Sequence, residues 1–122
     1  MFEKNMRIAY LLEFYADVLD EHVATVMRAY YNDDLSLAEI AQDEGISRQG
    51  IRHLIKRGEE SLEFFDERLK LTERHAELMA AVESLSGIAK ALKERGMTEE
   101  AQKTERVIGI ILKGNQDVRE SY

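Results

Sequence analysis

The sequence predicts an all-α protein: a helix-turn-helix unit with an N-terminal helix before it and a C-terminal helical extension after it. Three observations support this class. The 122 residues contain no proline, the strongest breaker of helices. Apolar residues recur at helical spacing along most of the chain. Finally, 44% of the residues are hydrophobic and 34% are charged, which suits amphipathic helices in water.

The first 35 residues predict two amphipathic helices. Residues 2–19 place apolar side chains three and four positions apart, with Phe14 at the edge of the stripe. Asp20 is placed to cap the next helix, which ends near the turn-forming residues 32–34. Tyr30 and Tyr31 can be read as stacking residues, but aromatic side chains at helical spacing beside an acidic cluster are typical of a core, so we expect both to pack there. The other apolar residues are Ile8, Leu11, Leu12, Tyr15, Val18 and Leu19 in the first helix, and Val23 and Met27 in the second.

Residues 36–45 predict the first helix of a helix-turn-helix motif. Ser36 can cap this helix, and Glu39 can reach back to complete a capping box. Gly45 provides the positive φ with which the chain leaves the helix. Glu44 stands where such motifs carry a buried apolar residue, so either its carboxylate reaches solvent or the hairpin is slightly open. The core-facing stripe is Leu37, Ile40 and Ala41.

Residues 46–58 predict the turn and the second helix. Ile46 is expected to pack the turn and Ser47 to cap the helix. Two capped helices joined by a glycine turn, with donor-rich side chains on the second, are typical of DNA-binding motifs. The alternative is an αα-hairpin that only packs and solvates its basic face. Core positions are Ile51, Leu54 and Ile55, and the outward set is Arg48, Gln49, Arg52, His53, Lys56 and Arg57.

The distribution of charge favours the second helix as a binding surface. The net charge is −7, which argues against a general nucleic-acid coat. Residues 13–44 hold nine acids against one base, and residues 59–67 hold five acids. Residues 47–58 hold four bases and no acid. We therefore expect modest, salt-sensitive binding of duplex DNA through this segment.

Beyond the motif the chain remains helical. Gly58 either bends the helix or permits close packing. An apolar stripe continues through Leu62, Phe65 and Leu69, and leucines recur every seven residues from Leu71 to Leu92. Residues 95–96 end that helix. A last helix is expected to begin after a Thr98 cap, with Glu99 and Glu100 in its first turn. This helix is expected to fray from Gly114 onward.

This pattern predicts two parts, residues 1–70 and residues 71–122. The cluster Val107–Leu112 is too wide for one narrow stripe, so the second part is expected to form a hairpin that packs or dimerises. A homodimer through residues 71–122 would supply a second DNA half-site. The alternative is that these stripes fold back on Phe64, Phe65 and the first helix in one monomeric core.

Other functions receive no support from the residues. The chain has no cysteine, so disulfides and thiolate sites are excluded. His22, His53 and His75 are too scattered for a metal cluster. Glycine-rich phosphate loops and nucleophile elbows are lacking. We therefore expect no catalytic activity, no metal and no cofactor. No apolar run approaches the roughly 20 residues of a membrane span, and the N-terminus lacks a signal-peptide layout, so a cytoplasmic protein without membrane insertion is expected.

Residues 20–69 resemble region four of bacterial sigma factors, which recognises promoters. The similarity lies in the sequence YYNDDLSLAEIAQDEGISRQGIRHLIKRGEESL. The N-terminal LLEFYADVL and the length narrow the resemblance to the YlxM family of small helix-turn-helix proteins. This resemblance implies a role in regulating or assisting the signal recognition particle pathway, and components of that particle as partners. It also implies that the following side chains face the DNA groove: Ser47, Arg48, Gln49, Arg52, His53 and Lys56. Relatives of the family differ at Glu44, Gly50 and Arg52-His53, so no preference for a DNA sequence can be inferred from them.

Overall fold

The computed structural model describes the backbone of residues 5–120 and the side chains of residues 5–114. Within that range the protein is helical without strands, which confirms the all-α class. A single 3₁₀ turn, η1, spans Ala16–Val18. The α-helices are α1 (Met6–Tyr15), α2 (Glu21–Tyr31), α3 (Leu37–Glu44), α4 (Arg48–Leu69), α5 (Leu71–Glu94) and α6 (Thr98–Glu120).

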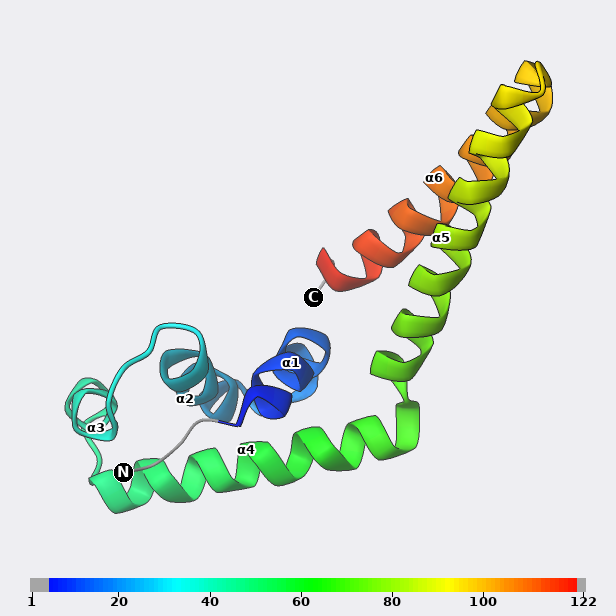
Figure 1. Cartoon of the computed structure of the whole chain (residues 1–122). Helices are drawn as coiled ribbons and strands as arrows, with labels where there is room; N and C mark the ends of the chain where they lie inside the picture. The colour runs from blue at the N-terminus through cyan, green and yellow to red at the C-terminus, as the bar shows by residue number, and fades with distance from the viewer. Residues whose placement is uncertain (1–4, 121–122) are drawn as a thin grey trace. The chain divides into compact units, whose positions relative to one another are not determined.

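The described chain divides into two compact units, residues 1–70 and residues 71–122. In the first unit, α4 contacts α1, α2 and α3 (Figure 1). This arrangement gives α4 one buried face and one free face along the same helix. The core between these helices is formed by Ile8, Leu11, Leu12, Tyr15, Val23, Val26, Met27, Tyr30, Ile40, Ile51, Ile55 and Leu62.

The first helix is shorter than predicted. It ends at Tyr15, and the chain continues in the 3₁₀ turn η1, closed by a 3.2 Å hydrogen bond from the Leu19 N–H to the Ala16 carbonyl. The tighter turn takes Val18 out of the apolar stripe, and its side chain is 52% exposed. Asp20 occupies the N-cap position of α2, but its side chain makes no capping hydrogen bond. Residues 2–4 of the predicted helix lie outside the described residues.

A polar network joins α1 to the C-terminal half of α4. The hydroxyl of buried Tyr15 donates to Asp66 Oδ1 at 2.8 Å, and Arg7 Nη2 donates to Asp66 Oδ2 at 3.3 Å. Arg7 Nε also donates to Glu63 Oε1 at 2.8 Å. Asp66 itself is buried, and a buried carboxylate is tolerated only with such partners. This network was not predicted.

Gly58 permits close packing and does not interrupt the helix. Helix α4 runs without a break from Arg48 to Leu69. A Cβ atom at Gly58 would lie 2.7 Å from both Cγ and Sδ of Met27 in α2. The helix ends at Leu69, and the left-handed φ of 56° at the C-cap residue Lys70 turns the chain. Leu69, which was expected to continue the apolar stripe, is exposed.

The second unit is a hairpin of α5 and α6, joined by a turn in which Gly96 has a φ of 77°. Lys93 Nζ pairs with Glu105 Oε1 across the hairpin at 2.7 Å. Two boundaries differ from expectation. Thr98 is the first residue of α6, and the helical backbone continues past Gly114 to Glu120, because one exposed glycine weakens a long helix without ending it.

Candidate nucleic-acid interface

The first helix of the motif, α3, begins with the predicted capping box. The Ser36 hydroxyl accepts from the Glu39 N–H at 3.1 Å, and the Ser36 N–H donates to Glu39 Oε1 at 3.0 Å. The backbone hydrogen bond from Ser36, followed by the one from its side chain, lowers the pKa of Glu39 below its usual value. The ionised carboxylate therefore fixes the start of α3 at neutral pH.

The turn after α3 has the predicted geometry at Gly45, with a φ of 69° and its N–H bonded to the Ala41 carbonyl. Ile46 is exposed and packs the turn less than expected. Glu44 does not replace a core side chain, since its Oε1 lies 2.8 Å from His22 Nε2 of α2. Its side chain is 25% exposed. The pair lets a carboxylate occupy a position that is usually apolar.

The second helix, α4, starts with a second cap and presents the predicted outward set. The Ser47 hydroxyl accepts from the Gly50 N–H at 3.0 Å, so this hydroxyl is engaged in capping. Ile51 and Ile55 are buried in the core, and Leu54 is half-buried. The side chains exposed on the free face are Arg48, Gln49, Arg52, His53, Lys56 and Arg57.

The basic residues of this face differ from the other arginines of the first unit. Arg7 bonds Glu63 and Asp66, and Arg28 pairs with Asp17 at 3.0 Å. Arg68 lies over the ring of Phe64, 4.9 Å from its centroid. Within the described residues, the four bases of 48–57 make no hydrogen bond or ion pair of that kind. Their charge therefore remains available to an external anion.

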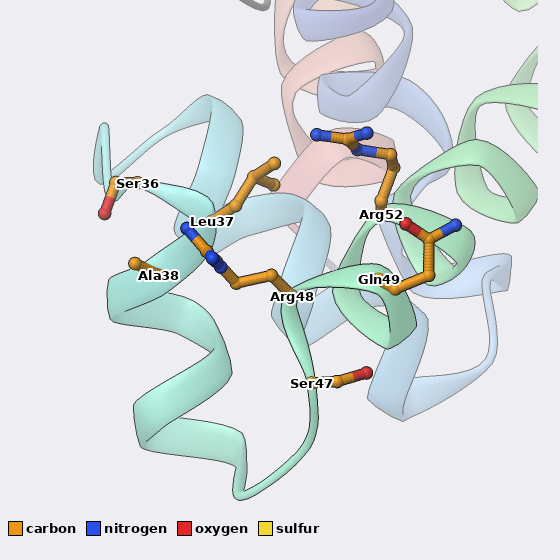
Figure 2. A pocket seen from close by; sticks show the side chains of 7 residues that line it. All are labelled: Ser36, Leu37, Ala38, Ser47, Arg48, Gln49 and Arg52. Carbon is orange, nitrogen blue, oxygen red and sulfur yellow. The ribbon is translucent and has the colours of Figure 1, made fainter.

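A hollow of about 720 Å³ opens between the starts of α3 and α4. In Figure 2 the Arg48 side chain extends toward the first turn of α3, while Gln49 and Arg52 project from positions of α4 that are three residues apart. Ser47, Arg48, Gln49 and Arg52 line the hollow. His53, Lys56 and Arg57 lie farther along α4 and do not contribute to it. The remaining lining residues, which were not predicted, are Ser36, Leu37 and Ala38.

A hydrogen bond holds α4 to α2 directly after the basic segment. The Tyr31 hydroxyl donates to Glu59 Oε2 at 2.6 Å. Burial and then this bond raise the pKa of Tyr31 far above its usual value. Tyr30 is buried beside it, with ring centroids 5.1 Å apart. The structure thus supports packing roles for both tyrosines.

Among the side chains described, no three of His, Cys, Asp or Glu are grouped as metal ligands. Across the described part of the chain, no helix combines the length and hydropathy that crossing a membrane requires.

Sequence comparison gives the family. Residues 2–106 match a family model described as "Putative helix-turn-helix protein, YlxM / p13 like". The chain belongs to this family. The match covers the whole first unit and continues through α5 into α6.

Individual relatives agree with the family match. The UPF0122 protein of Symbiobacterium thermophilum is 40% identical over 79 residues, which cover 65% of this chain and 74% of the relative. A UPF0122 protein of Clostridium perfringens is 39% identical over 99 residues, or 75% of this chain and 88% of the relative. One of Bacillus cereus is 41% identical over 85 residues, covering 70% and 77%.

Proposed function

We propose that this protein is a DNA-binding helix-turn-helix regulator that contacts duplex DNA through the free face of α4. The observation that carries the proposal is the set of four basic side chains on this face that have no ion-pair partner among the described residues, in a chain of net charge −7. This concentration of positive charge on the second helix of the motif is complementary to the negative charge of the phosphate backbone. Acidic segments before and after it oppose binding through other surfaces.

The position of each side chain along α4 suggests its role. Arg48 and Gln49 lie in the first turn, from which side chains reach base edges in the major groove. Arg52 and His53 follow one turn later on the same face. The remaining two, Lys56 and Arg57, are placed to meet phosphates. We assign the hollow at the start of α3, with Ser36, Leu37 and Ala38, to a phosphate of the strand that flanks the groove.

We propose that the two units have different functions. Residues 1–70 would bind DNA, and residues 71–122 would pack or dimerise. One helix-turn-helix offers few base contacts, and a homodimer presents a second one to the adjacent half-site. We propose that the protein acts as this homodimer in the cytoplasm, without catalytic activity and without a cofactor or metal.

The resemblance to the YlxM family supports a further proposal about context. We propose that the regulated or assisted process is the signal recognition particle pathway, with components of that particle as possible partners. The alternative function is a non-catalytic interaction scaffold, or an RNA-binding accessory, of the same pathway. The observation that favours the scaffold is the acidic balance of the chain together with the apolar side chains exposed on its hairpin.

A competition experiment separates these functions. A fluorescent duplex of random sequence is titrated with the protein at low salt, about 50 mM, where phosphate contacts are strongest. The bound complex is then challenged with unlabelled random duplex, structured RNA or buffer alone. Displacement by duplex at lower concentration than by RNA supports the DNA-binding function. Preferential displacement by RNA supports the accessory role, and the absence of binding to any duplex in the pool refutes the proposal in favour of the scaffold.

A further inference from the structure

The α5–α6 hairpin carries apolar side chains that its own packing leaves uncovered. Ile88 is 51% exposed, Val107 47% and Ile110 73%. Leu85, Leu92 and Ile111 beside them are half-buried. We call these six residues the hairpin's apolar face.

These residues lie on one side of the hairpin. The Lys93–Glu105 ion pair marks the opposite face, because each partner lies four residues, about 40° around its helix, past the buried Ala89 or Ala101 that faces the neighbouring helix. At about 100° per residue, Val107 lies roughly 160° from Glu105 and Ile88 roughly 140° from Lys93 around their helices. In an antiparallel pair, the flanks turned away from this ion pair form a common surface. The hairpin is therefore amphipathic as a two-helix layer.

The hairpin buries little against itself. Among its described side chains only Ala89 and Ala101 are buried, whereas the first unit buries many large aliphatic and aromatic residues. Ordering a residue costs backbone entropy, and helices in water depend on tertiary packing of an apolar face. The two buried alanines and the half-buried apolar side chains of the hairpin offset only part of this cost, so a second layer over the apolar face would stabilise the hairpin.

We infer that this second layer is the same face of another copy of this chain, which produces an antiparallel four-helix bundle. The inference rests on the proposed homodimer and names its contact surface. Ile88, Val107 and Ile110 together expose roughly 300 Å², already the size of the largest apolar patch on many monomers. With two helices about 35 Å long and 10 Å wide, the layer presents roughly 700 Å², close to the ~800 Å² per partner of a stable interface.

In the middle of α6 the sequence is compatible with a second copy of the same helix. An antiparallel two-fold contact centred between residues 108 and 109 places Val107 opposite Ile110. The same register sets Lys103 opposite Gly114 and Lys113 opposite Thr104, so lysines do not face one another. The six residues carry no charge, and nothing on this face selects an acidic or a basic partner. A self-complementary apolar surface favours a second copy over a charged peptide or a nucleic acid.

Light scattering coupled to size exclusion tests this inference on the full chain at tens of micromolar, without DNA. The expected mass for the wild type is twice the chain mass of 14.1 kDa. Val107→Glu buries unpaired charges in the interface and should weaken self-association at least about 100-fold. Val18→Glu is the matched control, because Val18 is 52% exposed in the first unit and lies outside the face.

The inference predicts that Val107→Glu is monomeric and helical by circular dichroism, that Val18→Glu remains dimeric, and that mixing Val107→Glu with Val107→Lys restores a dimer. A monomeric wild type, or a Val107→Glu dimer as tight as the wild type, overturns the inference. Should Val107→Glu unfold, the more exposed Ile110→Glu takes its place with the same expectations. A dimer that binds no duplex would refute the DNA-binding function while leaving this interface intact.

Discussion

The close contact between Gly58 of α4 and Met27 of α2 gives the sharpest test of how the first unit, residues 1–70, is packed. Substituting Gly58→Ala adds a Cβ atom 2.7 Å from Cγ and Sδ of Met27 and 3.0 Å from its Cε. Met27 is fully buried, so its side chain has no solvent into which it can move. The substitution therefore forces α4 away from α2 or Met27 into a strained rotamer.

Two opposing contributions set the size of the effect. Alanine is favoured over glycine inside a helix by about 1 kcal/mol. Overpacking a filled core costs about 1–3 kcal/mol. The overlap involves three atoms of one enclosed side chain, so we expect the packing cost to prevail. The predicted result is a net loss of about 1 kcal/mol in the free energy of unfolding.

Urea unfolding followed by circular dichroism measures this loss. Gly87→Ala is the first control, because a Cβ atom at Gly87 of α5 meets nothing within 4 Å. That substitution should stabilise its helix by about 0.5–1 kcal/mol. The second control is Gly58→Ala in a Met27→Ala background, where the removed side chain leaves room and the same substitution should become stabilising. If Gly58→Ala stabilises the wild type as much as it stabilises the Met27→Ala protein, the close-packing explanation is wrong.

Three further predictions concern Asp66, Glu39 and Lys56. Asp66→Ala should destabilise the protein by about 1–3 kcal/mol in urea unfolding, since the buried Tyr15 hydroxyl loses an acceptor. Glu63→Ala, at the exposed end of the same network, should cost about 0.5 kcal/mol. Equal losses for the two variants would contradict the assigned roles. The lowered pKa of Glu39 means that its contribution to stability is present above its unfolded pKa of 4.5 and is lost as pH falls through the lower folded value. Between pH 6 and pH 3 the Tm should therefore fall more for the wild type than for Glu39→Gln, whose side chain can still cap the helix but does not titrate in this pH range. Equal decreases in Tm for the two proteins would argue against the capping role. Lys56→Ala should weaken binding to all duplexes about equally and reduce the slope of log K against log salt by about one; a sequence-dependent loss would place Lys56 at a base instead.

Local chemistry made the motif predictable from the sequence. The caps at Ser36 and Ser47 and the turn at Gly45 depend on residues within four positions of one another, so their pattern fixes the geometry. The outward set on α4 follows from the same helical spacing, once Ile51 and Ile55 are assigned to the core. These features are the ones that the structure reproduces with the fewest changes.

Features that depend on contacts between distant segments were not predictable in the same way. The role of Gly58 depends on the position of Met27, 31 residues earlier. Glu44 looked anomalous because its partner, His22, lies on another helix. The hollow requires the starts of α3 and α4 to lie side by side, which neither helix specifies alone. Apolar spacing located the faces of α5 and α6, and the Lys93–Glu105 pair was needed to show that they share one side.

The most direct test of the proposed DNA-binding face is fluorescence anisotropy of a labelled duplex, titrated with the wild type, Arg52→Ala and Arg95→Ala at one low salt concentration. Arg52 lies on the free face of α4, whereas Arg95 is an exposed arginine in the turn between α5 and α6. Both substitutions remove the same charge, so only position distinguishes them. On the best duplex found, we expect Arg52→Ala to lose about 1–3 kcal/mol of binding free energy, roughly 5- to 150-fold in Kd, and Arg95→Ala to bind as the wild type does. Equal losses for the two variants, or unchanged binding by Arg52→Ala, would contradict the assignment of DNA binding to this face.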